Sequence, residues 1–238
     1  MQYDFIKGEI LLFDKPAGWT SFDLVNKVKH LLKRKLGVKK IKVGHAGTLD
    51  PLASGLLIVC TGAATKRIDE LQSMEKEYTG TFEIGATTPS FDRETDIDQR
   101  YPTDHITEEL IHQSAHFFEK RFEQIPPIFS AIKVDGKRAY DYARENLELE
   151  LKGRPVSIQT FNITRIEMPE VDIQVICSKG TYIRSLARDF GTELKSGAYM
   201  TQLRRTRIGQ HHVDNALDVM AFAEFIKTTY TLPAESES

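Results

Sequence analysis

The stretch GHAGTLDPLASGLLIVC, residues 44–60, decides the fold of this chain. Its first half is punctuated by glycine and proline, which is typical of a loop, and its second half is the apolar run 56–60. A short apolar run that follows turn residues predicts a buried strand. Asp50 lies inside the loop, and Pro51 restricts its backbone to an extended form. A carboxylate on a restrained loop suits a reactive group, although a simple Asp-Pro turn also explains this segment.

Hydrophobic periodicity around this stretch predicts further strands and helices. One helix is expected from an N-cap at Thr20, with Asp23 in a capping-box position, to Gly37. Further strands are predicted at 8–13, 78–84 and 171–177, and further helices at 107–122, 137–145, 181–194 and 216–226. The irregular alternation predicts an α+β fold with a mixed, mainly antiparallel sheet flanked by helices.

Composition limits the class of protein. The 238 residues allow one large domain or two small ones, with 40% hydrophobic and 28% charged residues. The N-terminus has no signal-peptide pattern, and no apolar run is long enough to span a bilayer. Cys60 and Cys177 both lie in apolar runs, so we expect two buried, unpaired thiols. These features predict a cytoplasmic protein without a membrane partner.

Basic residues are concentrated locally although the net charge is −2. The segment 27–42, KVKHLLKRKLGVKKIK, carries eight Lys or Arg and no acid, and a second basic stretch covers 178–207. Because salt screens charges beyond about 8–10 Å, local stripes matter more for phosphate contact than the net charge does. The stripes indicate either nucleic-acid binding or the solvated faces of amphipathic helices.

Several catalytic signatures are absent from the sequence. It has no Walker loop, no dinucleotide fingerprint, no H-E-x-x-H, no C-x-x-C and no G-x-S-x-G. His112 and His116 lie four residues apart but lack a third ligand nearby, so we expect a helix surface and no metal site.

A second chemical cluster lies in SKGTYIRSLARDFG, residues 178–191. Arg184 and Arg188 share one face of the predicted helix near its N-terminus, and Tyr182 lies in the first turn. An arginine beside a lone aspartate keeps the carboxylate ionised. A surface helix with a core tyrosine explains this segment equally well when it is taken alone.

Six segments in the same order resemble the TruB family of pseudouridine synthases. They are GEILLFDKPAGWTS (8–21), GHAGTLDPLASGLLIVCTGAATK (44–66), KEYTGTFEIGATTPSFDRETD (76–96), QIPPIFSAIKVDGKRAYDYAR (124–144), SKGTYIRSLARDFG (178–191) and LRRTRIG (203–209). The resemblance covers about residues 8 to 210, and six ordered motifs are far more specific than one.

The resemblance implies the pseudouridine synthase fold and an isomerase that converts uridine 55 in the tRNA T-loop to pseudouridine. The glycosidic bond breaks, uracil rotates, and a C–C bond forms. Asp50 matches the essential aspartate, which attacks or otherwise stabilises the ribose C1′. Tyr78 matches the tyrosine that stacks on the base and is a candidate for removing the C5 proton. Arg184 matches the arginine expected to pair with Asp50 and with Asp92.

The resemblance also implies residues that bind substrate. His45 matches a histidine that contacts the T-loop, Tyr182 matches a pocket residue, and Leu203 matches the apolar residue beneath uracil. Lys15 and Pro16 match supports of the pocket floor. The segment 124–156 is similar to an inserted lobe that folds over the T-arm.

The expected organisation is a single catalytic domain over residues 1–235. Many bacterial members continue into a C-terminal PUA-type domain, whereas 29 residues follow Gly209 here, so we expect none. We also expect no cofactor, no metal and a monomer that binds the T-arm and T-loop of tRNA. Two alternatives stay open, an RNA chaperone that remodels tRNA and a sibling synthase that acts on ribosomal or other RNA.

Overall fold

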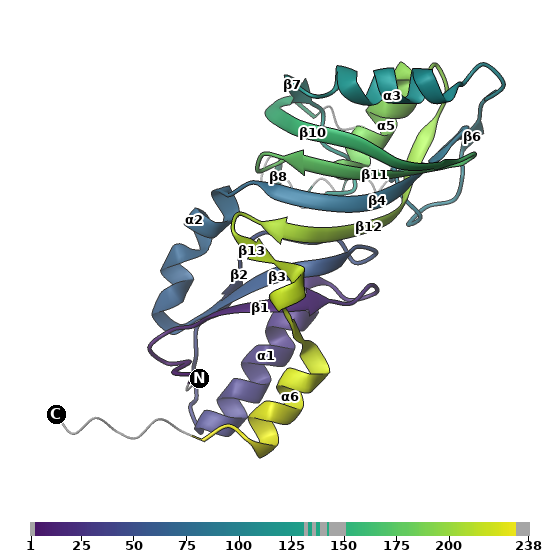
Figure 1. Ribbon diagram of the computed structural model, residues 1–238. Helices are drawn as coiled ribbons and strands as arrows, with labels where there is room; N and C mark the ends of the chain where they lie inside the picture. Colours follow the sequence, from purple (N-terminus) through teal and green to yellow (C-terminus); the bar gives the residue numbers. More distant parts are fainter. Residues whose placement is uncertain (1–2, 131–132, 135–136, 139–141, 143–150, 232–238) are drawn as a thin grey trace. The chain divides into compact units, whose positions relative to one another are not determined.

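The computed structural model describes residues 3–130, 133–134, 137–138, 142 and 151–231 (Figure 1). Its chain divides into two compact units, the first formed by Met1–Lys76 and Arg204–Ser238 and the second by Glu77–Leu203. Each unit contains strands and helices, as expected for an α+β fold. The expectation of one catalytic domain over 1–235 stays a prediction.

The first unit is built on a small mixed sheet with helices. Its elements are β1 (Ile10–Lys15), α1 (Ser21–Leu36), β2 (Val43–His45), β3 (Ser54–Thr61), η1 (Gly62–Arg67), α2 (Ile68–Ser73), the end of β12 (Ala198–Ile208), β13 (His211–His212), η2 (Val213–Asn215), β14 (Leu217–Asp218) and α6 (Val219–Thr228). Strand β3 pairs antiparallel with β1 and β2 and parallel with β12.

The central position of β3 explains why 56–60 is apolar without alternation. Leu57 and Val59 belong to a core formed with α1 and α6, which lie side by side against β1 (Figure 1). Leu56, Ile58 and Cys60 face a second core with Leu71 of α2. A strand that is covered on both faces has no solvent side, so it reads as one hydrophobic run.

The second unit contains the larger antiparallel part of the fold. Its elements are β4 (Lys76–Ile84), β5 (Ala86–Thr87), β6 (Gln99–Arg100), α3 (Glu108–Phe117), β7 (Arg121–Gln124), β8 (Lys133–Val134), β9 (Lys137–Arg138), β10 (Arg154–Glu167), β11 (Glu170–Cys177), α5 (Ile183–Glu193) and the start of β12. The sheet order is β12-β4-β11-β10-β7.

Aromatic side chains hold helix α5 to this sheet. Phe190 of α5 lies 6.0 Å from Phe82 of β4 and 5.3 Å from Phe161 of β10, between ring centroids. All three rings are fully or almost fully buried. This packing fixes the helix that carries Arg184.

Most predicted elements are confirmed. The helix that begins after Thr20 has the complete capping box with Asp23 and ends at Gly37 in a left-handed conformation (φ 66°). The strand predicted at 78–84 is β4, and the run 171–177 lies in β11.

Two predicted helices were wrong in part. The helix predicted at 107–122 ends at Phe117, because the following residues turn and enter β7 beside β10. At 137–138 the chain forms strand β9 with β8, and the rest of the helix predicted at 137–145 lies, except for residue 142, outside the described residues. Much of the expected inserted lobe at 124–156 lies outside them too.

Both cysteines lie in the interior of the fold. Cys60 and Cys177 are both buried, as expected. Burial raises the pKa of the Cys60 thiol to about 11. Among the described residues, no helix combines the length and apolarity that a membrane span requires.

Candidate active site

Asp50 lies in the loop between β2 and β3, and the hydroxyl of Ser21 holds this loop to helix α1. The Ser21 Oγ accepts a hydrogen bond from the Leu49 N–H (2.8 Å) and donates one to the Leu49 carbonyl (3.0 Å). The Gly18 N–H donates to the Pro51 carbonyl at 2.7 Å. Backbone groups on both sides of Asp50 are therefore bonded to the segment before α1 and to its first residue.

Arg205 holds the same loop from strand β12. Its side chain is 1% exposed, and its guanidinium donates to three backbone carbonyls. The acceptors and distances are Leu56 at 2.8 Å, Gly47 at 3.2 Å and Thr48 at 3.4 Å. A buried guanidinium satisfied by carbonyls keeps its charge close to the Asp50 loop.

Glycine is required where β3 passes Arg205. Gly55 has a φ of +105°, and a Cβ at this position would lie 2.3 Å from the Arg205 carbonyl oxygen. No larger residue fits without moving β12. The close approach brings the Arg205 strand against the end of the Asp50 loop.

Lys15 supplies a second buried cation in the first unit. Its side chain is fully buried, and its Nζ donates to the carbonyls of Pro16 (2.9 Å) and Trp19 (2.6 Å). Burial lowers the pKa of Lys15 to about 8, and the positive charge of Arg205 adds to this, whereas the negative charge of Asp50 opposes it. The coupling indicates that Asp50 and Lys15 lie within electrostatic range.

His45 ends strand β2, five residues before Asp50. Its ring is half-buried, and Nδ1 has no hydrogen-bond partner among the described residues. Burial lowers the pKa of His45, and the charge of Arg205 lowers it further. The lowered pKa favours the neutral imidazole, which offers hydrogen bonds without a charge.

In the second unit, the structure pairs Arg184 with Asp92 as expected. The Arg184 Nη1 lies 3.6 Å from the Asp92 Oδ2, and both residues are at least 96% buried. Asp92 Oδ1 also accepts from the Ser90 hydroxyl (2.6 Å) and from the Glu94 N–H (2.9 Å). These bonds fix the carboxylate, which in turn orients Arg184.

Tyr182 is fixed by its backbone at the start of α5. The side-chain amide of Gln124, which is 1% exposed, accepts from the Tyr182 N–H (2.8 Å) and donates to the Tyr182 carbonyl (3.2 Å). The Tyr182 side chain is half-buried. Gln124 therefore sets the position of the helix start that precedes Arg184.

Tyr78 and Leu203 are brought together on neighbouring strands. Tyr78 and Gly80 share one face of β4 because side chains alternate along a strand. A Cβ added at residue 80 would lie 2.5 Å from the Gln202 carbonyl oxygen and 3.4 Å from the Leu203 Cδ1, so β12 passes close to β4 here. Tyr78 is 8% exposed and Leu203 is 9% exposed, so both side chains are largely buried.

The predicted residues thus form groups within each unit. His45 and Asp50 lie in the first unit with Lys15 and Arg205, and the second unit holds the remaining five. The pairing of Asp50 with Arg184 stays a prediction. Within the described part of the chain, no cluster of three or more His, Cys, Asp or Glu is suited to a metal ion.

Sequence reasoning missed Arg205, Ser21 and Gln124. The sequence shows two adjacent arginines, and in a strand one of them must face the interior, because adjacent residues point to opposite faces. Arg204 forms a half-exposed bidentate pair with Asp14 (2.6 and 2.9 Å), so Arg205 must face the other way. Ser21 and Gln124 left no such signal, since their partners are backbone groups 28 and 58 residues away.

Two solved structures share the fold of this chain. A chain of an archaeal box H/ACA sRNP Nop10-Cbf5 complex is 26% identical, with a TM-score of 0.66 over 93% of this chain and 54% of that chain. A chain of a Cbf5-Nop10-Gar1 complex is 28% identical, with a TM-score of 0.70 over 94% and 56%. The present chain spans about half the length of those chains and shares their fold.

Sequence comparison gives the particular family. The profile of the TruB family pseudouridylate synthase N-terminal domain matches residues 33–183. Proteins called tRNA pseudouridine synthase B are 56% identical in Flavobacterium johnsoniae, over 94% of this chain and 98% of the relative, and 44% identical in Thermobifida fusca, over 91% and 75%. The chain belongs to the TruB family and is a pseudouridine synthase, an isomerase that acts on RNA.

Proposed function

We propose that this enzyme converts uridine 55 in the T-loop of tRNA to pseudouridine. The names of its bacterial relatives, which align over nearly its whole length, support tRNA as the substrate. The observation that carries the proposal is the bracing of the Asp50 loop by Ser21 and Arg205. Catalysis by a carboxylate depends on such preorganisation.

The proposed reaction conserves every atom of the nucleotide. The bond between N1 and C1′ breaks, uracil rotates, and C5 bonds to C1′. The C5 proton then leaves, and N1 gains a proton, so there is no net oxidation or hydrolysis. Positive charge develops at C1′ as the first bond breaks, and the Asp50 carboxylate is the group that meets it. Because nothing is oxidised or reduced, the reaction needs no redox cofactor.

Three further residues have different roles in the proposed reaction. They are Tyr78, Leu203 and Arg184. The Tyr78 ring stacks on uracil while Leu203 packs beneath it, which fits their adjacent positions on β4 and β12. The Tyr78 hydroxyl assists removal of the C5 proton. Arg184, which Asp92 orients, pairs with Asp50 in the free enzyme and positions the carboxylate.

Recognition requires the uridine to leave its stack. Extrusion of a base costs a few kcal/mol, and stacking on an aromatic ring returns about 1–3 kcal/mol. His45 contacts the T-loop as a neutral donor or acceptor, and Tyr182 lines the uridine pocket. The segment 124–156, part of which lies outside the described residues, covers the T-arm. An enzyme with this substrate works in the cytoplasm, and we expect it to act as a monomer.

Mapping of pseudouridine in an unmodified tRNA transcript tests the proposal. The purified protein should modify position 55 alone, without any added nucleotide. A transcript with cytidine at position 55 and a ribosomal RNA fragment serve as controls. Modification of the ribosomal fragment but not of tRNA would favour the sibling synthase. Folding of tRNA without any pseudouridine would favour the chaperone.

A further inference from the structure

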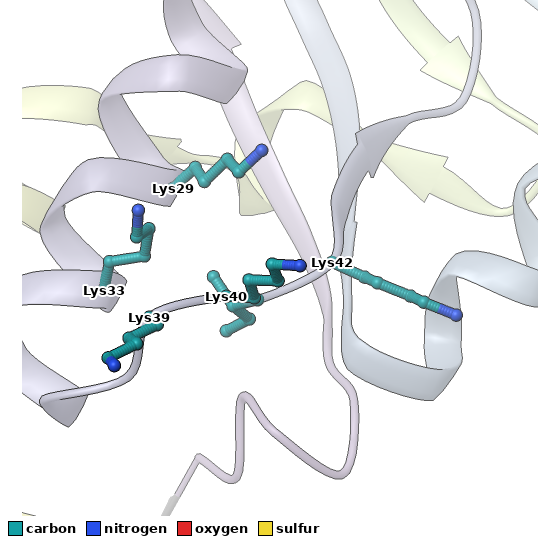
Figure 2. A pocket seen from close by; sticks show the side chains of 6 residues that line it. Lys29, Lys33, Lys39, Lys40 and Lys42 are labelled. Carbon is teal, nitrogen blue, oxygen red and sulfur yellow. The ribbon is translucent and has the colours of Figure 1, made fainter.

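Five lysines line one groove on the surface of the first unit (Figure 2). Two come from helix α1 and three from the chain that follows it, and the cavity between them has a volume of about 510 Å³. The lining residues, here called the lysine groove, are Lys29, Lys33, Lys39, Lys40, Ile41 and Lys42. The lining includes no acidic side chain.

The backbone of the lysine groove is anchored, so the charges are held in place. Gly37 ends α1 and turns the chain back along the helix. Ile41 packs against the core that α1 and α6 share, while its neighbours Lys40 and Lys42 are exposed. The Lys42 carbonyl accepts from the Gly62 N–H at 3.0 Å. The fixed segment therefore presents flexible cationic side chains on a rigid base.

None of the five ammonium groups has an ion-pair or hydrogen-bond partner among the described residues. Lys35 on the same helix differs, because its Nζ donates to the Lys227 carbonyl at 3.1 Å. Charge compensation of the α1 C-terminus accounts for Lys33, which lies in the last turn. It does not account for the three lysines beyond Gly37. The five positive charges repel one another, and they lie close together in a protein whose net charge is −2.

We propose that the lysine groove binds the phosphodiester backbone of the substrate RNA, away from the reacting uridine. This inference rests on the proposed function, since it assigns a second contact of the same substrate. Lysine acts as a point charge on a flexible stem and suits repeated phosphates, whereas a small anion is usually held by arginine forks or buried donors. The groove contains neither.

The position of the lysine groove in the first unit fits this ligand. Strand β2 follows Lys42 directly and leads to His45 and then to Asp50. Asp50 is eight positions after Lys42 in the chain, so the two lie at most about 28 Å apart even if the chain were fully extended. An RNA stem whose loop reaches Asp50 can place neighbouring phosphates over the lysines. A membrane is a poorer match, because Ile41 is the sole apolar lining residue and packs inward.

The test compares two triple variants that remove the same charge. The groove variant is Lys39→Gln, Lys40→Gln and Lys42→Gln. The control variant is Lys7→Gln, Lys195→Gln and Lys227→Gln, at exposed positions outside the groove. Equilibrium binding of tRNA is measured from 50 to 300 mM salt, and thermal melting verifies that both variants fold.

The groove variant should lower the slope of log affinity against log salt by about two to three ion equivalents. Its affinity near 150 mM salt should fall about tenfold or more, with a matching rise in KM that disappears at low salt. The control variant should retain the slope of the parent. Equal slopes for the groove variant and the parent would overturn the proposal.

Pseudouridine formation by the parent and binding to anionic vesicles show whether the proposed function or the groove proposal has failed. If the parent forms no pseudouridine but the slopes still differ, the proposed function fails and the groove is supported as an RNA site. If the parent modifies tRNA and the slopes agree, the groove proposal alone fails. Binding of the parent and of the groove variant to vesicles with anionic lipid is measured as well. Loss of vesicle binding without loss of tRNA binding would overturn the RNA assignment.

Discussion

The Asp50 loop and the β4–β12 surface achieve rigidity in different ways. Asp50 lies on irregular backbone, and side chains distant in sequence, Ser21 and Arg205, bond to that backbone. Tyr78 and Leu203 lie on adjacent strands, where sheet hydrogen bonds and a glycine already fix their distance. The proposed reactive group on a loop therefore depends on bracing residues, whereas the proposed base-stacking surface depends on strand register.

Removal of the Asp50 charge should have the largest effect. Asp50→Asn keeps the loop and its backbone bonds but cannot stabilise charge at C1′. We expect turnover to fall by about 10⁴-fold or more, which corresponds to about 5.5 kcal/mol of barrier. Binding of tRNA should stay within a few fold. Asp69→Asn, at an exposed position, is the matched control, and near-parental product formation by Asp50→Asn would refute the assignment.

Substitution of Tyr78 should separate stacking from proton transfer. Tyr78→Phe keeps the ring, so affinity should hold while single-turnover formation of pseudouridine slows by about 10²–10⁴-fold. Tyr78→Ala should in addition cost about 1–3 kcal/mol in RNA binding. Tyr199→Phe, which removes another hydroxyl from this unit, should turn over like the parent.

Either variant can contradict the role given to Tyr78. Parental turnover of Tyr78→Phe would leave the hydroxyl without a catalytic function. Parental affinity of Tyr78→Ala would mean that the ring does not stack on the base and serves as a core residue of β4.

Loss of the Ser21 hydroxyl should disturb the loop but not the strand surface. Ser21→Ala leaves the N–H and the carbonyl of Leu49 unpaired, which should lower the free energy of unfolding by about 2 kcal/mol. A small displacement of Asp50 should reduce kcat by up to about 10²-fold. Ser73→Ala, which removes one exposed hydrogen bond, is the control. An unchanged kcat would show that the loop keeps its geometry without Ser21.

The smallest expected effect is a pH dependence of stability at Lys15. Its pKa is lowered to about 8 in the folded protein, against 10.5 in the unfolded chain. Between these values the unfolded state holds a proton that the native state has released, so stability rises with pH. The cost of the buried charge is fully present below pH 8. Because one pKa unit corresponds to about 1.4 kcal/mol, we expect a gain on the order of 1 to 3 kcal/mol between pH 8 and 10.5.

Denaturant unfolding from pH 7 to 10.5 measures this gain. Lys15→Met removes the titrating group, so its stability relative to the parent should fall as pH rises through this range. A difference that does not change with pH would mean that Lys15 does not titrate there.

The sequence by itself determined the local elements and the family, and it predicted which residues form the site. The capping box at Thr20, the apolar run of β3 and the alternation in β4 arise from neighbouring residues, so their patterns are readable without a structure. The six ordered motifs indicated the TruB family and predicted catalytic roles for Asp50 and Tyr78.

The tertiary structure alone decided how those residues are held and where helices stop. The helix predicted at 107–122 ends at Phe117 because β7 pairs with β10, a contact that sequence periodicity does not encode. Arg205 is buried because three carbonyls from a distant loop and strand accept its hydrogen bonds. Backbone carbonyls are present at every residue, so no sequence pattern shows which of them a side chain will meet.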